Sequence, residues 1–379
     1  MSSRNLVRDQ ASHRVVSLEL FFDLVFVYGI SQVTAYLAYD HSPLGFVRGL
    51  LLAGLLWWAW VAYSWLGTSV QVGRGWVQAS LFAAMAAIMV LAVLMLDFFD
   101  DQRGASLAMV AAAAYVVVRV MHIVVFAIAG GEDAGIRQAV LRLAWSVVIA
   151  AVLLIFGAYL GGTWQLIMVC IALAIDVIGP LLAGGGGWQL ALGHFAERHS
   201  LIVIIALGES IVAIGLGAAD VPVGPGLLVM ICLGVALACT LWVAYFDGSA
   251  TAVEHAVAQR SGVEQVTTAR DTYSYLHFLL VSGLILIALA MKSGLKGTEA
   301  GLSEPLAGYA GFALGLGLCQ FLGGLWLIRW RAGVDRSVAE IVVAVLALAL
   351  IPLATTVPAV GSVLAASMLV IGWRAVRRN

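Results

Sequence analysis

Apolar residues fill most of the chain in twelve runs, each long enough to cross a bilayer as a helix. A helix of about 20 residues spans the ~30 Å hydrocarbon core. The chain is therefore predicted to be an all-α polytopic membrane protein with about twelve transmembrane helices. Pro352 and Pro358 interrupt the last two runs, so ten or eleven spans would also fit. The runs cover residues 18–38, 44–66, 76–98, 105–129, 138–160, 163–183, 200–218, 225–247, 273–291, 305–328, 338–356 and 358–376.

Composition removes several classes of function. Hydrophobic residues make up 63% of the 379 residues and charged residues only 11%, which leaves little chain for a soluble domain. The net charge of -1 provides no basic face for nucleic acid. The four cysteines lack paired spacing and lie in apolar runs, so we interpret them as small core residues and expect no disulfide framework, metal site or cofactor. They are Cys170, Cys232, Cys239 and Cys319.

The loops indicate an orientation. Most of the 20 Lys and Arg residues fall in loops on one side of the predicted bundle, and such residues accumulate on the cytoplasmic side. Both termini are therefore predicted to be cytoplasmic. The expected partners are the lipid bilayer and a small solute or ion, and the protein could form a homo-oligomer.

Two segments resemble each other. Residues 22–30 (FDLVFVYGI) and 208–215 (GESIVAIG) each place one carboxylate in an apolar run, and residues 60–65 resemble residues 242–247. This pattern predicts two parallel six-helix repeats, residues 1–183 and 184–379, in one membrane domain, with the glycine run at 184–187 as a flexible linker. The alternative is that a biased composition produces the likeness.

The first predicted span carries two carboxylates. Glu19 and Asp23 lie four residues apart and share a helix face, so they could share a proton or a cation. Charged groups are costly in hydrocarbon and usually mark function. Alternatively, Glu19 reaches water at the headgroup boundary and Asp23 pairs with an arginine.

Glu209 lies about ten residues into its predicted span and needs a partner there. The hydroxyl of Ser210 is one candidate. Gly208, Gly215 and Gly217 would let another helix approach closely. Glu209 is the strongest single candidate for a functional carboxylate.

Three further polar residues lie in predicted spans. Arg119 and His122 are three residues apart near the middle of one span, and Asp176 precedes Pro180 in another. His122 is either a proton relay or a hydrogen-bonded core residue. The region of Asp176 is a place where a broken helix could expose backbone carbonyls. Arginine keeps its charge in proteins, so Arg119 is predicted to pair with a buried carboxylate such as Asp23, Glu19, Glu209 or Asp176.

The remaining candidates lie near predicted span ends. His194, Glu197 and Arg198 precede the predicted span 200–218 on the cytoplasmic side, where headgroup contact is the simple interpretation, and their order matches no zinc-protease motif. His277 is predicted to be interfacial. The tryptophans, including Trp57, Trp58, Trp60 and Trp65 near one span end, are predicted to be aromatic-belt anchors.

The two carboxylate segments carry a family resemblance. VSLELFFDLVFVYGISQV, with GHFAERHSLIVIIALGESIVAIG much later, resembles the bacterial low temperature requirement protein A (LtrA) family over essentially the whole chain. That resemblance implies a multi-pass protein of the bacterial cytoplasmic membrane, linked by name to growth in the cold.

A weaker similarity concerns residues 22–26 (FDLVF). They look like the Phe-Ser-Asp signature on the first helix of the endolysosomal potassium channel family, in which each repeat has six spans. Phe22 replaces the serine of that signature, and the second copy has Gly208-Glu209. The similarity therefore implies a two-by-six architecture and does not extend to potassium selectivity.

The leading hypothesis from the sequence is a transporter or channel for a small solute or ion, with proton coupling through the intramembrane carboxylates. The second is a membrane-embedded enzyme that acts on a lipid or apolar metabolite by acid/base chemistry, although the chain has none of the usual nucleophile or phosphate-binding motifs. A non-catalytic sensor or assembly factor is the third.

Overall fold

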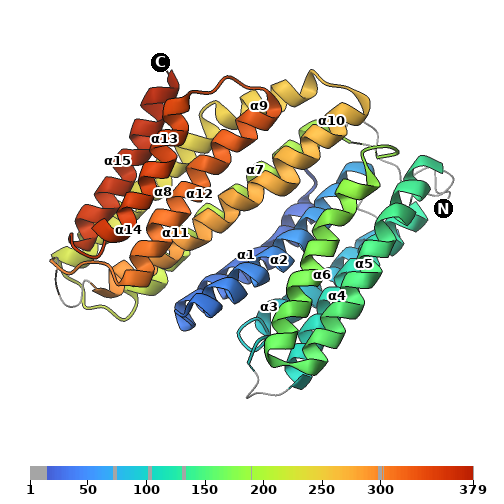
Figure 1. Ribbon diagram of the computed structural model, residues 1–379, viewed down its shortest axis with the longest axis horizontal. Coiled ribbons are helices and arrows are strands. Elements are labelled where there is room, and N and C mark those ends of the chain that lie inside the picture. The colour runs from blue at the N-terminus through green and yellow to red at the C-terminus, as the bar shows by residue number, and fades with distance from the viewer. Residues whose placement is uncertain are drawn as a thin grey trace. The chain divides into compact units, whose positions relative to one another are not determined.

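The fold is almost wholly α-helical. The computed structural model describes residues 15–70, 75–100, 105–129, 134–188, 190–297, 301 and 303–378, and the helices in this part of the chain are long and close together (Figure 1). Eleven of the described helices are long and apolar enough to span a membrane, and a shorter apolar helix covers Val338–Leu353. The prediction of an all-α polytopic membrane protein with about twelve transmembrane helices is confirmed.

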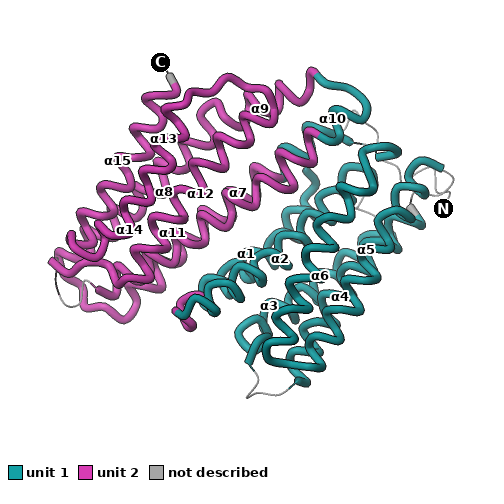
Figure 2. The backbone as a smooth tube through the Cα atoms, in the orientation of Figure 1, with its two compact units in different colours: residues 1–36, 42–198, 260–267 teal, residues 37–41, 199–259, 268–379 magenta. Residues whose placement is uncertain are grey.

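The described helices fall into two compact units (Figure 2). Unit 1 comprises residues 1–36, 42–198 and 260–267, and unit 2 comprises residues 37–41, 199–259 and 268–379. Each unit is made of several segments of the chain, and α7 passes from unit 1 to unit 2 after Arg198. Whether the two halves are repeats of each other stays a prediction.

Unit 1 is built around its second helix. Every residue of α2 from Leu52 to Ser69 except Trp65 is buried. Ser42 caps the start of α2 by accepting a hydrogen bond from the Gly45 backbone N–H at 2.9 Å, and Pro43 occupies the first turn, where its missing N–H costs nothing. Its first six helices are α1 (Ser17–Tyr39), α2 (Pro43–Ser69), α3 (Gly75–Val93), α4 (Ala105–Ala129), α5 (Ala134–Leu160) and α6 (Gly162–Ala183).

Unit 2 has its buried centre in α11 and α12. All residues of α11 from Leu280 to Met291 are buried. Its helices are α7 (Leu192–Ala218), α8 (Pro225–Phe246), α9 (Ser249–Ala258), α10 (Gly262–Ala269), the π-helix η3 (Arg270–Leu276), α11 (His277–Gly297), α12 (Gly308–Ala332), α13 (Val338–Leu346), the 3₁₀ turn η4 (Ala347–Ala349), α14 (Leu350–Leu353) and α15 (Ala359–Arg378). The first two turns of α7 and the start of α10 belong to unit 1.

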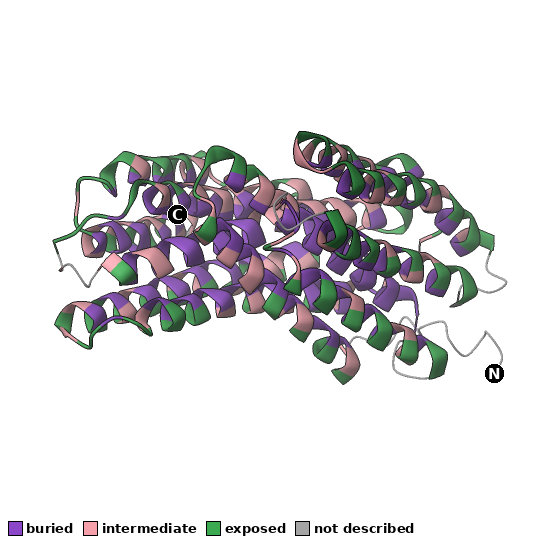
Figure 3. Cartoon of the chain, turned by 90° about the horizontal axis from the view of Figure 1, so that it is seen from below, coloured by how far each residue is buried: buried purple, intermediate pink, exposed green. Residues whose placement is uncertain are grey.

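Glycine lets α11 and α12 touch backbone to backbone. A Cβ on Gly283 would lie 2.6 Å from the carbonyl oxygen of Gly317, and one on Gly317 would lie 2.7 Å from the carbonyl oxygen of Gly283. Close backbone approach is the usual way in which membrane helices gain packing energy, since lipid removes the hydrophobic driving force between them. Figure 3 shows the result, with buried residues on the facing sides of helices and exposed residues on the outward sides.

The segment α13–η4–α14 runs the length of α12, although it is short and irregular. At one end Arg329 of α12 forms an ion pair with Glu340 of α13. At the other end, the chain before α12 bonds to the turn after α14, where the Leu306 N–H donates to the carbonyl of Ala354 at 2.9 Å. This segment therefore lies along α12 in the opposite direction, and it is shorter than the eleven helices that are long enough to span a membrane.

Glycines at the midpoint of the chain and on α7 lie in different surroundings. A Cβ on Gly185 would lie 2.9 Å from Thr267 Cγ2 and one on Gly187 would lie 2.5 Å from the carbonyl oxygen of Gly135, whereas nothing lies within 4 Å of a Cβ built at Gly184 or Gly186. That the run 184–187 is a flexible linker stays a prediction. On α7, nothing lies within 4 Å of a Cβ built at Gly208 or Gly215. Gly217 alone of the three α7 glycines permits a close approach, to the carbonyl oxygen of Lys292 at 2.9 Å.

Candidate functional site

Two ion pairs form a ladder inside unit 1, between the start of α1 and the first two turns of α7. Glu19 Oε2 lies 2.7 Å from His194 Nε2, and Asp23 pairs with Arg198 through Oδ1 and Nη2. None of these four side chains belongs to a residue more than 1% exposed. Both partners step by four residues from one pair to the next, so the two segments lie side by side and run in the same direction.

The start of α7 brings two of these residues into the bundle. The sequence predicted a span from residue 200, with His194, Glu197 and Arg198 before it in contact with headgroups. The helix begins at Leu192 instead, which turns His194 and Arg198 inward, so the headgroup interpretation of these two was wrong. Glu197 is exposed, and it accepts a hydrogen bond from the Val15 backbone N–H at 3.0 Å.

Helix α2 packs against the two ion pairs of the ladder. The Trp60 indole N–H donates to Asp23 Oδ1 at 2.9 Å, and the Arg198 guanidinium lies 5.4 Å from the centre of the Trp60 ring. Arg198 Nη1 also donates to the carbonyl of Tyr63 at 3.3 Å. Trp57, Trp58 and Trp60 are all buried, so the aromatic-belt interpretation was wrong for them.

Gly67 leaves space for the Glu19–His194 pair. A Cβ at this position of α2 would collide with Glu19 Oε1 and would lie 3.2 Å from His194 Cε1. The Glu19–His194 pair therefore lies directly against the α2 backbone. Only glycine leaves space for a carboxylate and an imidazole at this point.

The two pairs differ in chemistry. Arginine does not release its proton in proteins, so the Arg198 side of the Asp23–Arg198 pair keeps its charge. An imidazole carries a proton on one or on both of its ring nitrogens, so the Glu19–His194 pair has more than one possible protonation state. Glu19 Oε2 also accepts from the Val16 backbone N–H at 3.0 Å, and with Glu19 ionised the His194 Nε2–H is the donor of the 2.7 Å bond.

A third buried ion pair joins α4 to α6. Arg119 Nη2 lies 2.6 Å from Asp176 Oδ1, and the Tyr115 hydroxyl donates to Asp176 Oδ2 at 3.1 Å. The prediction that Arg119 pairs with a buried carboxylate is confirmed, and the fold selects Asp176. This carboxylate has two donors, so the pair has the geometry of a strut between two helices.

His122 and Tyr63 lie between the ladder and this strut. The Tyr63 hydroxyl donates to the carbonyl of Val118 at 3.1 Å, and the ring of His122 lies 5.8 Å from that of Tyr63 and 5.2 Å from that of Phe126. The two nitrogens of His122 make no hydrogen bond of normal geometry, and the Ala62 backbone is the polar group near them. His122 is thus a buried, aromatic-packed histidine next to a charged network.

Several buried polar atoms of this network have no hydrogen-bond partner. They include Asp23 Oδ2, the Ser64 hydroxyl, His194 Nδ1 and Arg198 Nε. Buried polar atoms are nearly always satisfied in proteins, by protein groups or by small molecules such as water. Unit 1 therefore holds donors and acceptors able to bind a small polar species or to pass a proton.

Glu209 and His277 belong to unit 2, whereas the ladder belongs to unit 1. Glu209 is buried on α7, beside Ser210, whose hydroxyl is buried without a hydrogen-bond partner. His277 is buried in the protein: its Nδ1 lies 2.8 Å from the carbonyl of Thr272 and its Nε2 lies 3.0 Å from the Tyr245 hydroxyl. A carbonyl only accepts, so Nδ1 carries the proton and Nε2 accepts from Tyr245.

Sequence reasoning missed Trp60, Tyr63, Tyr115 and Gly67. One signal was available in the sequence. Glu19 and Asp23 in the first predicted span are four residues apart, and so are His194 and Arg198 before the seventh predicted span. Sequence reasoning also missed the charge of Glu340, which is completely buried and forms a capping box with Ser337. The pattern Ser-x-x-Glu before an apolar run would have marked that helix start.

These features define a polytopic α-helical membrane protein with a charged network in its interior. The family model described as bacterial low temperature requirement A protein (LtrA) matches residues 14–375, and the chain belongs to this family. An uncharacterized protein of Rhizobium meliloti (strain 1021) is 27% identical to it over 330 residues, which cover 82% of this chain and 76% of that protein. No solved structure matches.

Proposed function

We propose that this LtrA family protein is a transporter or channel for a small solute or ion, with the buried carboxylates of unit 1 on its pathway. The observation that carries the proposal is the ladder of Glu19–His194 and Asp23–Arg198 within membrane-spanning helices. Ionisable groups at such positions are costly and generally line the paths of substrates, ions or protons.

Proton coupling is assigned to the Glu19–His194 pair. With His194 Nε2 donating to Glu19, its Nδ1 is a buried nitrogen with no hydrogen-bond partner and is able to accept a proton. The resulting imidazolium would balance the charge of Glu19, whereas neutral His194 leaves that carboxylate without a counter-charge in the pair. Movement of a proton on and off this pair would change its charge during the transport cycle.

Asp23 and Arg198 supply a fixed element beside it. Asp23 Oδ1 is held by two donors, from Arg198 and Trp60, and Oδ2 remains available to a hydrogen-bond donor or a cation. His122, also buried in unit 1, is the second candidate for a proton carrier. Glu209, on the unit 2 part of α7, is a separate candidate for a pathway carboxylate.

Flux in liposomes tests the proposal. Wild-type protein and the variants Glu19→Gln, Asp23→Asn and Glu209→Gln would be reconstituted, and proton and potassium flux followed by fluorescence under several gradients. Glu264→Gln is the matched control, because Glu264 is an exposed carboxylate with an i,i+4 arginine partner, Arg260. We expect wild-type and control protein to conduct, and Glu19→Gln and Asp23→Asn to lose flux, with the size of each variant in detergent measured alongside.

The outcomes separate the alternatives. Normal flux in both Glu19→Gln and Asp23→Asn would remove the ladder from the mechanism, and loss only in Glu209→Gln would place the pathway in unit 2. No flux in wild-type protein under any gradient would favour transport of a specific untested solute or the membrane-embedded enzyme.

A further inference from the structure

A π-helix leads directly into α11 in unit 2. Seven residues, Arg270–Leu276, form η3 between α10 and α11, so one long helix changes from α to π and back to α. In a π-helix each backbone N–H bonds five residues back, against four in an α-helix, and such segments are rare and frequent at functional sites. The contacts around η3 therefore have to account for its π form.

The end of η3 leaves one carbonyl for a side chain to satisfy. Counting back five residues from Leu276, the last residue of η3, gives Asp271. Counting back four residues from His277, the first residue of α11, gives Tyr273. The carbonyl of Thr272 between them is passed over, and His277 Nδ1 lies 2.8 Å from it. A carbonyl only accepts, so the imidazole donates from Nδ1 and takes the place of the missing backbone N–H.

Tyr245 of α8 fixes the imidazole in the tautomer that donates. Its hydroxyl lies 3.0 Å from His277 Nε2 and donates to it, so the ring proton stays on Nδ1. The ring of Tyr273 stacks on the imidazole with 5.1 Å between the ring centres, and the ring of His199 from α7 lies 5.4 Å away. With the proton on Nε2 instead, the lone pair of Nδ1 would face the Thr272 carbonyl oxygen, and the two acceptors would repel each other.

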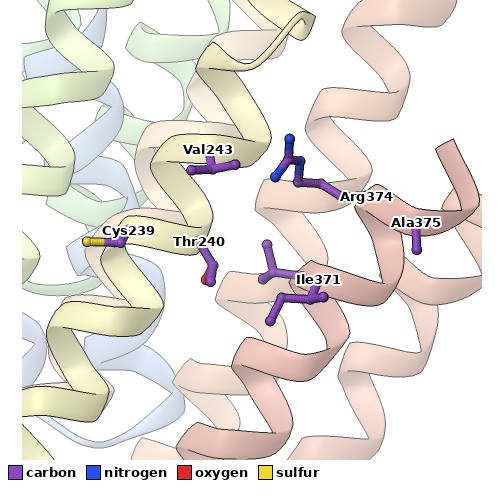
Figure 4. Close-up of a pocket in the computed structure, with 7 residues that line it drawn as sticks. Cys239, Thr240, Val243, Ile371, Arg374 and Ala375 are labelled. Atoms are coloured by element: carbon purple, nitrogen blue, oxygen red, sulfur yellow. The ribbon is translucent and has the colours of Figure 1, made fainter. Parts of the chain in front are cut away.

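The Tyr245 hydroxyl is on the side of α8 that meets α11. Figure 4 shows another side of this helix, where Thr240 and Val243 line a pocket shared with α15. Tyr245 follows Val243 by two residues, which places it about 200° further around the helix, and its side chain is buried. Removal of the Tyr245 hydroxyl therefore leaves the pocket side of α8 unchanged.

We propose that η3 is a conformational switch, with His277 as the lock on its π form and Tyr245 as the residue that holds His277 in the locking tautomer. With the Nδ1–H bond present, the passed-over carbonyl is satisfied and the π form is stable. Without it, η3 reverts to regular α bonding. The lock belongs to unit 2 and does not depend on transport through unit 1.

The switch moves the residues that precede η3. Loss of one π step shifts them by one residue relative to α11, which is a rise of about 1.5 Å and a rotation of about 100°. Arg331 of α12 donates to the Thr268 hydroxyl on this moving part at 3.1 Å, and it also contacts Asp271 Oδ2 at 2.8 Å. Release of the lock therefore changes the packing of α10 and η3 against α12.

Hydrogen exchange of the full-length protein in nanodiscs tests the lock. Exchange of the peptide that covers residues 268–280 would be measured by mass spectrometry in wild-type protein and in Tyr245→Phe, which removes a single oxygen atom. Tyr245→Phe should exchange about tenfold faster, the factor that one lost hydrogen bond of ordinary strength gives in an equilibrium constant. Tyr159→Phe, at an exposed tyrosine of α5, is the matched control and should exchange as wild type does.

Replacement of His277 separates the lock from a loss of packing. Asn places an amide N–H where the imidazole has Nδ1, so His277→Asn should keep wild-type exchange, with or without Tyr245→Phe. His277→Leu has no donor and should exchange at least as fast as Tyr245→Phe. Deletion of Tyr275 removes the extra residue of the π-helix, so exchange in that protein should no longer depend on His277.

NMR of nitrogen-labelled histidine gives a second and direct measurement. The signals of His277, identified by their absence in His277→Asn, should show a protonated Nδ1 and an unprotonated Nε2 in wild-type protein. A proton on Nε2 alone, or equal exchange in Tyr245→Phe and wild type, would overturn the proposal. Both results are obtained without His277→Leu, so they stand even if that variant folds poorly.

Discussion

The ladder residues depend on their partners to different degrees. Arg198 has a carboxylate, an indole ring and a backbone carbonyl around its guanidinium, whereas the charge of His194 is matched by Glu19 alone among the contacts described. Removal of one partner from a buried pair leaves an uncompensated charge, which costs far more than the pair contributes when intact. Stability measurements therefore test the Asp23–Arg198 pair, and the pH dependence of flux tests the Glu19–His194 pair.

Asp23→Asn should destabilise the protein strongly. It leaves Arg198 charged and buried without a counter-charge, and breaking such a pair costs about 3–5 kcal/mol. Thermal unfolding in detergent would measure this as a lower Tm. The double variant Asp23→Asn/Arg198→Gln removes both charges and should recover much of the loss, and a double variant no more stable than the single one would contradict this account.

His194→Gln should change the pH profile of flux. Its side-chain amide is able to donate a hydrogen bond to Glu19 but takes up no proton across an assay range of about pH 5 to 8. If wild-type flux varies with pH over that interval, the variant should give a flat profile with a similar maximum. His255→Gln, at an exposed histidine of α9 that contacts the Thr251 carbonyl, is the control. A profile that keeps its wild-type shape in His194→Gln would assign the proton to another group, with His122 the first to examine.

Among the elements, α2 has the strictest packing requirement. It contacts the ladder at Trp60, Tyr63 and Gly67, which recur along one side at helical spacing. The same helix is buried on nearly all sides, so it has little freedom to move away from an added group.

Gly67→Ala should therefore be destabilising, by about 1–3 kcal/mol, because the new methyl group overlaps Glu19 Oε1. Gly208→Ala is the matched control in a helix interior, where nothing lies within 4 Å of the added Cβ, and it should be neutral or stabilising by about 0.4–1 kcal/mol. Unfolding curves of both variants under one detergent condition would check the difference. Equal stability of the two variants would show that α1 and α7 move enough to accommodate the added methyl group.

The stability of helix α13 depends on the capping of its first turn. Ser337 caps α13 and Glu340 both completes the capping box and pairs with Arg329. Ser337→Ala should cost about 1 kcal/mol of stability, the usual value for loss of an N-cap. Ser80→Ala, at a half-buried serine of α3 whose hydroxyl donates to the Trp76 carbonyl, should have a smaller effect. A Tm shift in Ser337→Ala no larger than that in Ser80→Ala would mean that the ion pair alone holds this helix start.

For the whole molecule, the number of crossings determines where the C-terminus lies. The α13–η4–α14 segment runs the length of α12, and the Asp247–Arg374 pair places the ends of α8 and α15 together. With twelve crossings both termini lie on one side of the membrane, which the loop charges predict to be the cytoplasm. Reporter fusions at the two ends should both give the cytoplasmic signal. Opposite signals would mean an odd number of crossings and a segment 338–353 that turns back within the membrane.

Local composition and periodicity determined much of this protein. Long apolar runs have one stable form in a bilayer, the helix, because every backbone N–H and C=O must be satisfied within the segment. The class, the approximate number of helices and the need of Arg119 for a buried carboxylate all followed from that rule. The family resemblance rested on two local motifs that contain Asp23 and Glu209, and the family is confirmed.

Tertiary structure decided which charges meet. Four carboxylates were possible partners for Arg119, and only the packing of α4 on α6 selected Asp176. His194 and Arg198 lie in a polar stretch whose hydropathy predicts a surface, but α7 begins early enough to bury them against α1. A charge is stable in the membrane interior only beside its partner, and that partner lies 175 residues away in the chain. Local sequence therefore shows that a buried charge needs compensation, and the fold supplies it.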